Sequence, residues 1–130
     1  MGRVAKQADG IFVSIEFRLR LVDFLERTMW GSRMPKAYTI VCYHSISDPQ
    51  KLAAYAKLAP AATAPFGARY LARSNAAEAY EHGRKERTVI AEFPSLEKAV
   101  AAYNSAAYAE ALKALGDGAV RDVRIVEGLE

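Results

Sequence analysis

The sequence is poor in cysteine, and its charges are nearly balanced. The single cysteine, Cys42, excludes an internal disulfide and any cysteine-based zinc cluster, and it suits a reducing compartment. A formal net charge of +3 over 130 residues is too small to steer the protein toward nucleic acid. We therefore expect no nucleic-acid partner.

Long apolar runs are also missing. The best candidate is interrupted by Glu16, Arg18, Arg20 and Asp23, whereas a membrane-spanning helix needs about 18 apolar residues in succession. The same charges are incompatible with the uncharged core of a secretory signal. We therefore expect no membrane partner and a cytoplasmic protein.

Length and composition indicate one domain with an appended segment. A chain with 52% hydrophobic and 25% charged residues can bury one core but is too short for two ordinary domains. Residues 1–33 differ from the rest, because they hold the only Trp and two of the three Met. We interpret 1–33 as an N-terminal extension that either forms a helix over Phe17 to Met29 or reflects a misassigned start, with Met34 as the native one. The folded domain is expected at 34–130, and the extension is expected to be dispensable for folding.

Local signals in the first half of that domain predict a strand followed by a helix. The segment from Ala37 to Ser45 is rich in β-branched and aromatic residues, which are typical of a strand. Asp48 followed by Pro49 is typical of a helix start, because a carboxylate caps free N–H groups and the fixed φ of proline suits the first turn. Pro65 and Gly67 should end this helix.

The second half predicts a hairpin, two helical pieces and a last strand. Arg69 to Arg73 and Glu86 to Phe93 read as antiparallel strands with a long connection. Ser95 and Ser105 are predicted to cap consecutive helical pieces. The segment Val120 to Glu127 alternates apolar and charged residues, as a strand with one wet face does. The first helical piece should bury an apolar stripe made of Leu96, Ala99, Val100 and Tyr103.

The expected order is β-α-β-β-α-β, the split βαβ arrangement of an α+β, ferredoxin-like fold. Its four-stranded antiparallel sheet carries the helices on one face and leaves the other face uncovered. Because a monomer would expose that face to water, we expect a two-fold homodimer in which the uncovered faces meet. The outward set is expected to be Tyr38, Ile40, Cys42, Tyr70 and Val89, or their alternate neighbours.

Several short motifs, taken together, resemble a known family. They are Phe66-Gly67-Ala68-Arg69-Tyr70-Leu71-Ala72-Arg73, Tyr80-Glu81-His82-Gly83, Glu92-Phe93-Pro94-Ser95 with Ala99, Tyr103, Ser105 and Tyr108 after it, and Val126-Glu127-Gly128. From about Pro35 to Gly128 the chain is similar to the domain-of-unknown-function family 1330. The resemblance implies a dimeric α+β barrel of ferredoxin-like topology, and it brings no established chemistry. Similar barrels include cofactor-independent monooxygenases, lactone isomerases and simple binding proteins.

The chain departs from this family pattern at two places. Ala68 replaces the second glycine of a Gly-Gly pair, and Ser74-Asn75 replaces another such pair. Alanine and serine accept a positive φ poorly, whereas asparagine tolerates it. The departures put in doubt any close approach of a ligand to the backbone at the ends of this strand.

Three groups of residues are candidates for a functional site. His44 ends the first strand, where it is either a general base facing a cavity or a side chain bonded to a loop carbonyl. Arg73 and Glu81 flank the hairpin connection, where they either form an ion pair or share a pocket in which Arg73 holds a carboxylate or enolate. Tyrosine hydroxyls could belong to a binding pocket or to the rim of the core: Tyr38, Tyr43, Tyr70, Tyr103 and Tyr108.

No cofactor or metal motif is present. The two histidines, His44 and His82, lack carboxylates at ligand spacing, so no metal site is predicted. Gly116-Asp117-Gly118 precedes a strand instead of opening a helix, so it is not a phosphate-binding loop. Cys42 lies among apolar neighbours in a predicted strand, where a thiol behaves as a small hydrophobe.

These observations favour a homodimer that binds a small apolar or carboxylate-bearing metabolite between sheet and helices, with Arg73, Tyr38, Tyr70 and Tyr108 as the binding residues. The alternative is a small cofactor-independent enzyme of monooxygenase or isomerase type that uses His44 or Arg73, with Glu81 as a further candidate. The sequence leaves the choice between them open. It predicts neither a substrate nor a cofactor.

Overall fold

The computed structural model describes residues 34–129. The predicted extension at 1–33, with its helix over Phe17 to Met29, lies outside the described residues. Pro35–Leu129 form one compact unit. Its elements follow in the order β1 (Ala37–Ile46), α3 (Pro49–Thr63), the 3-10 helix η2 (Ala64–Phe66), β2 (Arg69–Asn75), β3 (Arg87–Phe93), α4 (Leu96–Tyr103), α5 (Ala106–Leu115) and β4 (Ala119–Glu127).

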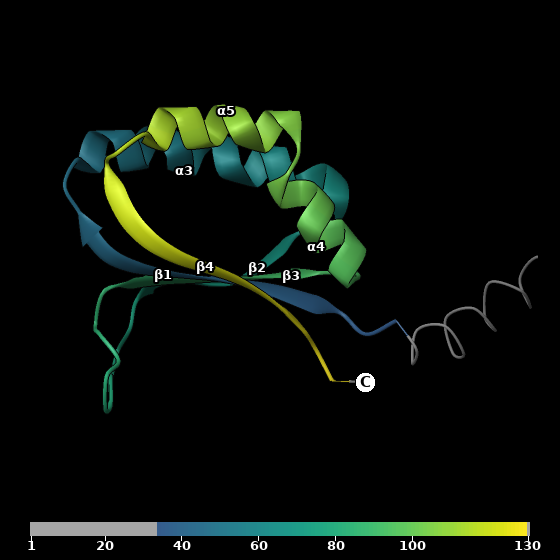
Figure 1. Cartoon of the computed structure of the whole chain (residues 1–130), viewed down its shortest axis with the longest axis horizontal. Helices are drawn as coiled ribbons and strands as arrows, with labels where there is room; N and C mark the ends of the chain where they lie inside the picture. The colour runs from purple at the N-terminus through teal and green to yellow at the C-terminus, as the bar shows by residue number, and fades with distance from the viewer. Residues whose placement is uncertain (1–33, 130) are drawn as a thin grey trace, which may run out of the picture. The chain divides into compact units, whose positions relative to one another are not determined.

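The four strands form one antiparallel sheet with the spatial order β2-β3-β1-β4. Helices α3 and α5 lie side by side over one face of this sheet, together with α4, and the connection between β2 and β3 extends on the opposite side (Figure 1). The predicted α+β class and the order β-α-β-β-α-β are confirmed. The second helix of this order is divided into α4 and α5.

Side-chain caps start the three α-helices at the predicted residues. Asp48 Oδ1 accepts hydrogen bonds from the backbone N–H groups of Gln50 and Lys51, at 3.0 and 3.1 Å. The hydroxyl oxygens of Ser95 and Ser105 each accept a backbone N–H three residues later, at 3.2 Å in both cases. Each cap satisfies a donor that has no partner inside its helix.

Strand register decides which side chains face the helices. On β1, Ala37, Val41 and Tyr43 are buried toward the helices, while the alternate residues face the uncovered side. Val41 pairs with Val89, and residues directly opposite in an antiparallel pair point to the same face. The uncovered face therefore carries Tyr38, Ile40, Cys42, Ile90, Val120 and Val126.

Two members of the predicted outward set are wrong. Val89 shares the helix-covered face with Val41, and Tyr70 pairs with Ala91 and packs against that same side. A shift of one residue moves a side chain to the other face of a sheet, and local sequence does not report the pairing partner. An irregularity between Tyr70 and Ala72 adds to the difficulty in β2.

Helix α4 turns its smallest side chains toward the sheet. Ala99 and Ala102 are each 1% exposed, whereas Leu96 and Val100 are 39% and 41% exposed. The predicted stripe was therefore wrong at two positions, because the buried face is centred on the alanines. Because the methyl side chains of Ala99 and Ala102 fill less space than leucine and valine would, room is left between α4 and the sheet.

Gly67 is the residue that turns the chain from η2 into β2. It has a φ of 84° and ends η2 in the left-handed region. An added Cβ would lie 2.7 Å from Cγ of Pro94. We expect Gly67→Ala to lower the free energy of unfolding by about 2 kcal/mol or more, because it combines left-handed strain with a steric overlap. Urea denaturation followed by circular dichroism measures this loss.

The control separates the two causes. In a Pro94→Ala background the new methyl meets no ring, so Gly67→Ala should cost less there than in the wild-type chain. An unchanged urea midpoint for Gly67→Ala in the wild-type chain would show that this turn does not need glycine.

Candidate functional site

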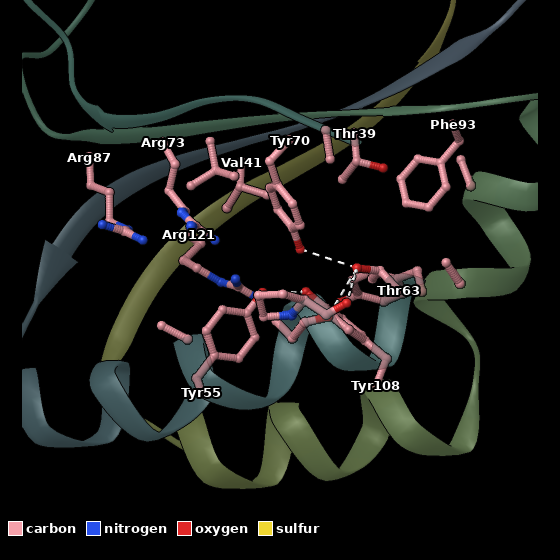
Figure 2. Close-up of a pocket in the computed structure, with 18 of the residues that line it drawn as sticks. Thr39, Val41, Tyr55, Thr63, Tyr70, Arg73, Arg87, Phe93, Tyr108 and Arg121 are labelled. Carbon is pink, nitrogen blue, oxygen red and sulfur yellow. Dashed lines mark hydrogen bonds between the residues drawn. The ribbon is translucent and has the colours of Figure 1, made fainter. Parts of the chain in front are cut away.

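A cavity lies between the helix-covered face of the sheet and the helices α3, α4 and α5. It measures about 50 Å³ as space open to the centre of a water-sized sphere, and one water needs about 10 to 15 Å³ of such space. The cavity thus accommodates a few waters or a compact organic group. Figure 2 shows that its lining comes from both layers of the fold.

Three arginines line this cavity: Arg73 on β2, Arg87 on β3 and Arg121 on β4. No aspartate or glutamate is among the lining residues. Within residues 34–129, no ion pair includes any of these arginines. Because a guanidinium stays protonated in proteins, the cavity carries three positive charges with no counter-charge in its lining.

Tyrosine rings hold the three guanidinium groups. The guanidinium carbons of Arg87 and Arg121 lie 5.7 and 5.6 Å from the ring centroid of Tyr43. Arg121 also lies 4.8 Å from the centroid of Tyr55, and Arg73 lies 5.0 Å from that of Tyr70. The faces of these rings attract cations. Each arginine is thus positioned by an aromatic ring.

Two of these N–H groups have no partner. Nε of Arg87 and Nη1 of Arg121 are buried and make no hydrogen bond within the described part of the chain. A buried donor without an acceptor costs free energy that a protein seldom leaves uncompensated. Both donors are therefore available to water or to another acceptor inside the cavity.

Hydroxyl groups form two pairs on the helix side of the cavity. The hydroxyl oxygens of Tyr55 and Tyr108 are 2.6 Å apart. Thr63 Oγ1 lies 3.0 Å from the carbonyl oxygen of Ala59, to which it donates, and 3.2 Å from the hydroxyl of Tyr70. Figure 2 shows the contact between Thr63 and Tyr70 as a dashed line. In the first pair one hydroxyl donates to the other, which leaves one O–H free to donate elsewhere.

Burial disfavours the ionised forms of Tyr55 and Tyr70. It raises the pKa of Tyr55 well above the ordinary value, Tyr108 adds to the effect, and the nearby Arg121 cation offsets only part of it. Burial also raises the pKa of Tyr70, with partial compensation from the hydrogen bond to Thr63. Burial is the largest influence on the pKa of Arg121 and lowers it, but Tyr55, Tyr108 and Tyr43 together outweigh burial, so this pKa is raised overall. The cavity therefore presents cations and neutral hydroxyl donors.

Three of the predicted binding residues meet in the cavity. Arg73, Tyr70 and Tyr108 all line it, as do Tyr43 and Tyr103. They come from β1, β2, α4 and α5, so the tertiary fold brings together residues that are far apart in the sequence.

The other predicted site residues lie elsewhere. Tyr38 is on the uncovered face, where its hydroxyl donates to Glu92 Oε2 at 3.4 Å. His44 is exposed at the end of β1, where Arg84 Nη1 lies 3.3 Å from Nδ1 and 3.2 Å from its carbonyl oxygen. Glu81 is exposed in the hairpin connection with a φ of 57°. It does not line the cavity, and the predicted contact between Arg73 and Glu81 does not occur within residues 34–129.

Sequence reasoning missed Tyr55, Arg87 and Arg121, although a signal for both arginines was present. Arg87 is followed at alternate positions by Val89, Ala91 and Phe93, and Arg121 by Val123 and Ile125. Each arginine therefore lies on the apolar face of its strand. A cation on the buried face of each of two strands indicates a site, whereas the alternation of β4 alone predicts a wet face for its charges.

Over residues 34–129, no three side chains of His, Cys, Asp or Glu are close enough to hold a metal ion. The helices of this same range are too short or too polar to cross a membrane.

The raised pKa of Tyr55 predicts a loss of stability at high pH. An unfolded tyrosine ionises near pH 10, whereas folded Tyr55 ionises above that value. The folded state then binds more protons, so the free energy of unfolding falls as pH rises above about 10. We expect Tyr55→Phe to flatten this fall, measured by urea denaturation between pH 9 and pH 11.

Tyr80→Phe is the matched control, because Tyr80 is 77% exposed and outside the cavity. Equal pH dependence in Tyr55→Phe and Tyr80→Phe would contradict the assignment of the effect to burial in the cavity.

Comparison with known proteins places the chain in a family. The model of the domain of unknown function DUF1330 matches residues 36–129. Among curated proteins, no relative is found. A protein of unknown function from Rhodopseudomonas palustris has a similar structure, with a TM-score of 0.59 and 15% identity over 83% of this chain and 93% of its own.

SnoaB, a cofactor-independent oxygenase from Streptomyces nogalater, is also similar in structure, with a TM-score of 0.51 and 10% identity over 74% of this chain and 95% of its own. At such identities the likeness concerns the fold alone. The matched segment covers most of the chain, including every residue of the arginine-lined cavity. The chain belongs to the DUF1330 family, whose members are described as having a domain of unknown function.

Proposed function

We propose that the protein binds a small carboxylate-bearing metabolite in the cavity between the sheet and the helices. The observation that carries this proposal is the convergence of Arg73, Arg87 and Arg121 on a cavity whose lining contains no carboxylate. A structural role for these arginines would be expected to pair them with acidic side chains. Such pairs are formed by other basic residues of the described chain, for example Lys51 with Asp117 at 2.7 Å.

A carboxylate fits the donors that are present. The two-pronged guanidinium group matches the geometry of a carboxylate and can donate two parallel hydrogen bonds to it. Nη1 of Arg121 and Nε of Arg87 are free to donate, and one hydroxyl proton of the Tyr55–Tyr108 pair remains available. Binding would give these donors acceptors and would supply the missing negative charge.

A second candidate is a cofactor-independent enzyme of monooxygenase or isomerase type. The observation in its favour is the Tyr55–Tyr108 pair beside Arg121, because a cation and a hydroxyl donor stabilise an enolate. The lining has no histidine, aspartate or glutamate to act as a general base near neutral pH. His44, the base expected from the sequence, lies outside the cavity. Binding is therefore the better supported function.

Substitution of Arg121 tests the binding proposal. We expect Arg121→Gln to weaken butyrate binding about tenfold or more, because charge-assisted hydrogen bonds are lost. Arg121→Lys keeps the positive charge but loses the two parallel N–H donors of the guanidinium. Its affinity for butyrate should therefore lie between those of the wild-type protein and Arg121→Gln. Chemical-shift changes of backbone amides in ¹⁵N NMR titrations measure the affinities, with butyramide as the uncharged ligand of equal size.

Arg69→Gln is the matched control, because Arg69 lies on the same sheet and outside the cavity. Two results would contradict the proposal: equal affinity for butyrate and butyramide, or an equal loss in Arg69→Gln and Arg121→Gln.

We also propose that the uncovered sheet face binds a second copy of this chain. It carries apolar side chains, with Val120 and Val126 59% and 47% exposed and Ile40 and Ile90 half-buried. Four strands of 7 to 10 residues make up the face. At about 4.8 Å between strands and about 3.4 Å per residue, two apposed faces bury roughly 1,000 Å² or more. This area reaches the lower bound of about 1,000 Å² for a specific interface.

The dimer is tested by sedimentation equilibrium of the full chain. We expect a mass of twice the chain mass of 14.3 kDa at micromolar concentration. Ile40→Lys should shift it to the single-chain mass, because it places a charge in the middle of the proposed interface. Val100→Lys, on the exposed side of α4, should not.

A single-chain mass for the wild-type protein at every concentration would rule the dimer out. It would also mean that solvent or a different partner covers the face.

A further inference from the structure

The arginine-lined cavity has two unlike ends. Arg73, Arg87 and Arg121 gather at one end, here called the cationic end, and Phe93 lies at the opposite end (Figure 2). The register agrees with this view, since Arg121 pairs with Tyr43 near the end of β1, whereas Phe93 pairs with Ala37 at its start. Along the cavity-facing side of β3, Arg87 thus stands at one end and Phe93 at the other.

The end opposite the arginines is lined mainly by apolar side chains, with the hydroxyl-bearing Thr39 beside Phe93 (Figure 2). It is formed by Ala91, Phe93, Ala99 and Ala102, which are 5%, 3%, 1% and 1% exposed and pack in one cluster. We call these four residues the apolar end. None of their side chains has a hydrogen-bonding atom. A carboxylate placed among them would lose its water, and the single hydroxyl of Thr39 does not replace the several hydrogen bonds of a hydrated carboxylate.

We propose that the ligand is an amphipathic monocarboxylate, with its carboxylate at the cationic end and a compact chain of a few carbons at the apolar end. This inference rests on the proposed function and adds the orientation and class of the ligand. Three cations alone would favour a dianion such as a dicarboxylate. The apolar end opposes it, because the second carboxylate would lie against Phe93 and the alanines.

The size of the apolar end follows from its alanines. Ala99 and Ala102 leave room where α4 faces the sheet, and Phe93 and Tyr103 also line the cavity. Apolar carbons placed in it would be removed from water, at a gain of about fourfold in affinity per added methylene. The gain should stop once the small cavity is filled.

A series of unbranched acids tests this inference on the full-length protein. We expect affinity to rise about fourfold per carbon from acetate through butyrate and then to level off. Succinate, which has the length of butyrate and a second carboxylate, should bind at least tenfold more weakly than butyrate. Amide chemical shifts in ¹⁵N NMR titrations give the affinities, and nuclear Overhauser effects between the ligand methyl group and the Phe93 ring give the orientation.

Variants at neighbouring positions of α4 supply the matched comparison. Ala102→Leu fills the apolar end, so it should weaken butyrate at least tenfold and leave acetate within about twofold. Ala101→Leu places the same side chain on the exposed side of the helix and should change neither. The acid series and the Overhauser effects need no variant, so they decide the question even if Ala102→Leu fails to fold.

The outcomes separate this inference from the proposed function. Binding of acetate and butyrate with equal affinity, or tighter binding of succinate than of butyrate, would overturn the amphipathic ligand while leaving a carboxylate site intact. Absence of binding for every acid of the series would overturn the proposed function itself.

Discussion

The contact on which the candidate site depends is that of two guanidinium groups with one tyrosine ring. Tyr43 is 3% exposed on the central strand β1, and Arg87 and Arg121 reach its ring from the strands on either side. Cations that are brought together away from water repel each other. Each contact with an aromatic face offsets roughly 0.5 to 2 kcal/mol of that cost. The remainder is what an anionic ligand would relieve.

The space around these arginines exists because the core between the sheet and the helices is not completely filled. Alanines supply much of the buried surface of α3 and α4, and the gap that they leave under the helices is the cavity. Larger side chains would give a denser core and greater stability. Caps fix where the helices around the cavity begin, and the left-handed turn at Gly67 fixes where β2 begins. Rigid elements around an open space are what a binding site requires.

The two faces of the sheet carry different chemistry. The helix-covered face combines arginines, tyrosine hydroxyls and small apolar residues. The uncovered face combines aliphatic side chains with pairs such as Arg124 and Asp122, whose closest atoms are 2.9 Å apart. Because successive residues of a strand point to opposite faces, the proposed ligand binding and the proposed self-association would use the same four strands without sharing a side chain.

The sequence by itself determined the elements and their order. Asp48, Ser95 and Ser105 act within a few residues of the chain, and capping depends only on such neighbours. The tertiary structure alone decided the register, which moved Tyr70 and Val89 to the helix-covered face and left Tyr38 on the other. It alone also joined Tyr55, Arg87 and Arg121 in one cavity and kept His44 and Glu81 apart from it. The physical reason is that pairing between distant strands fixes which alternate set of side chains is buried, and no local propensity encodes that choice.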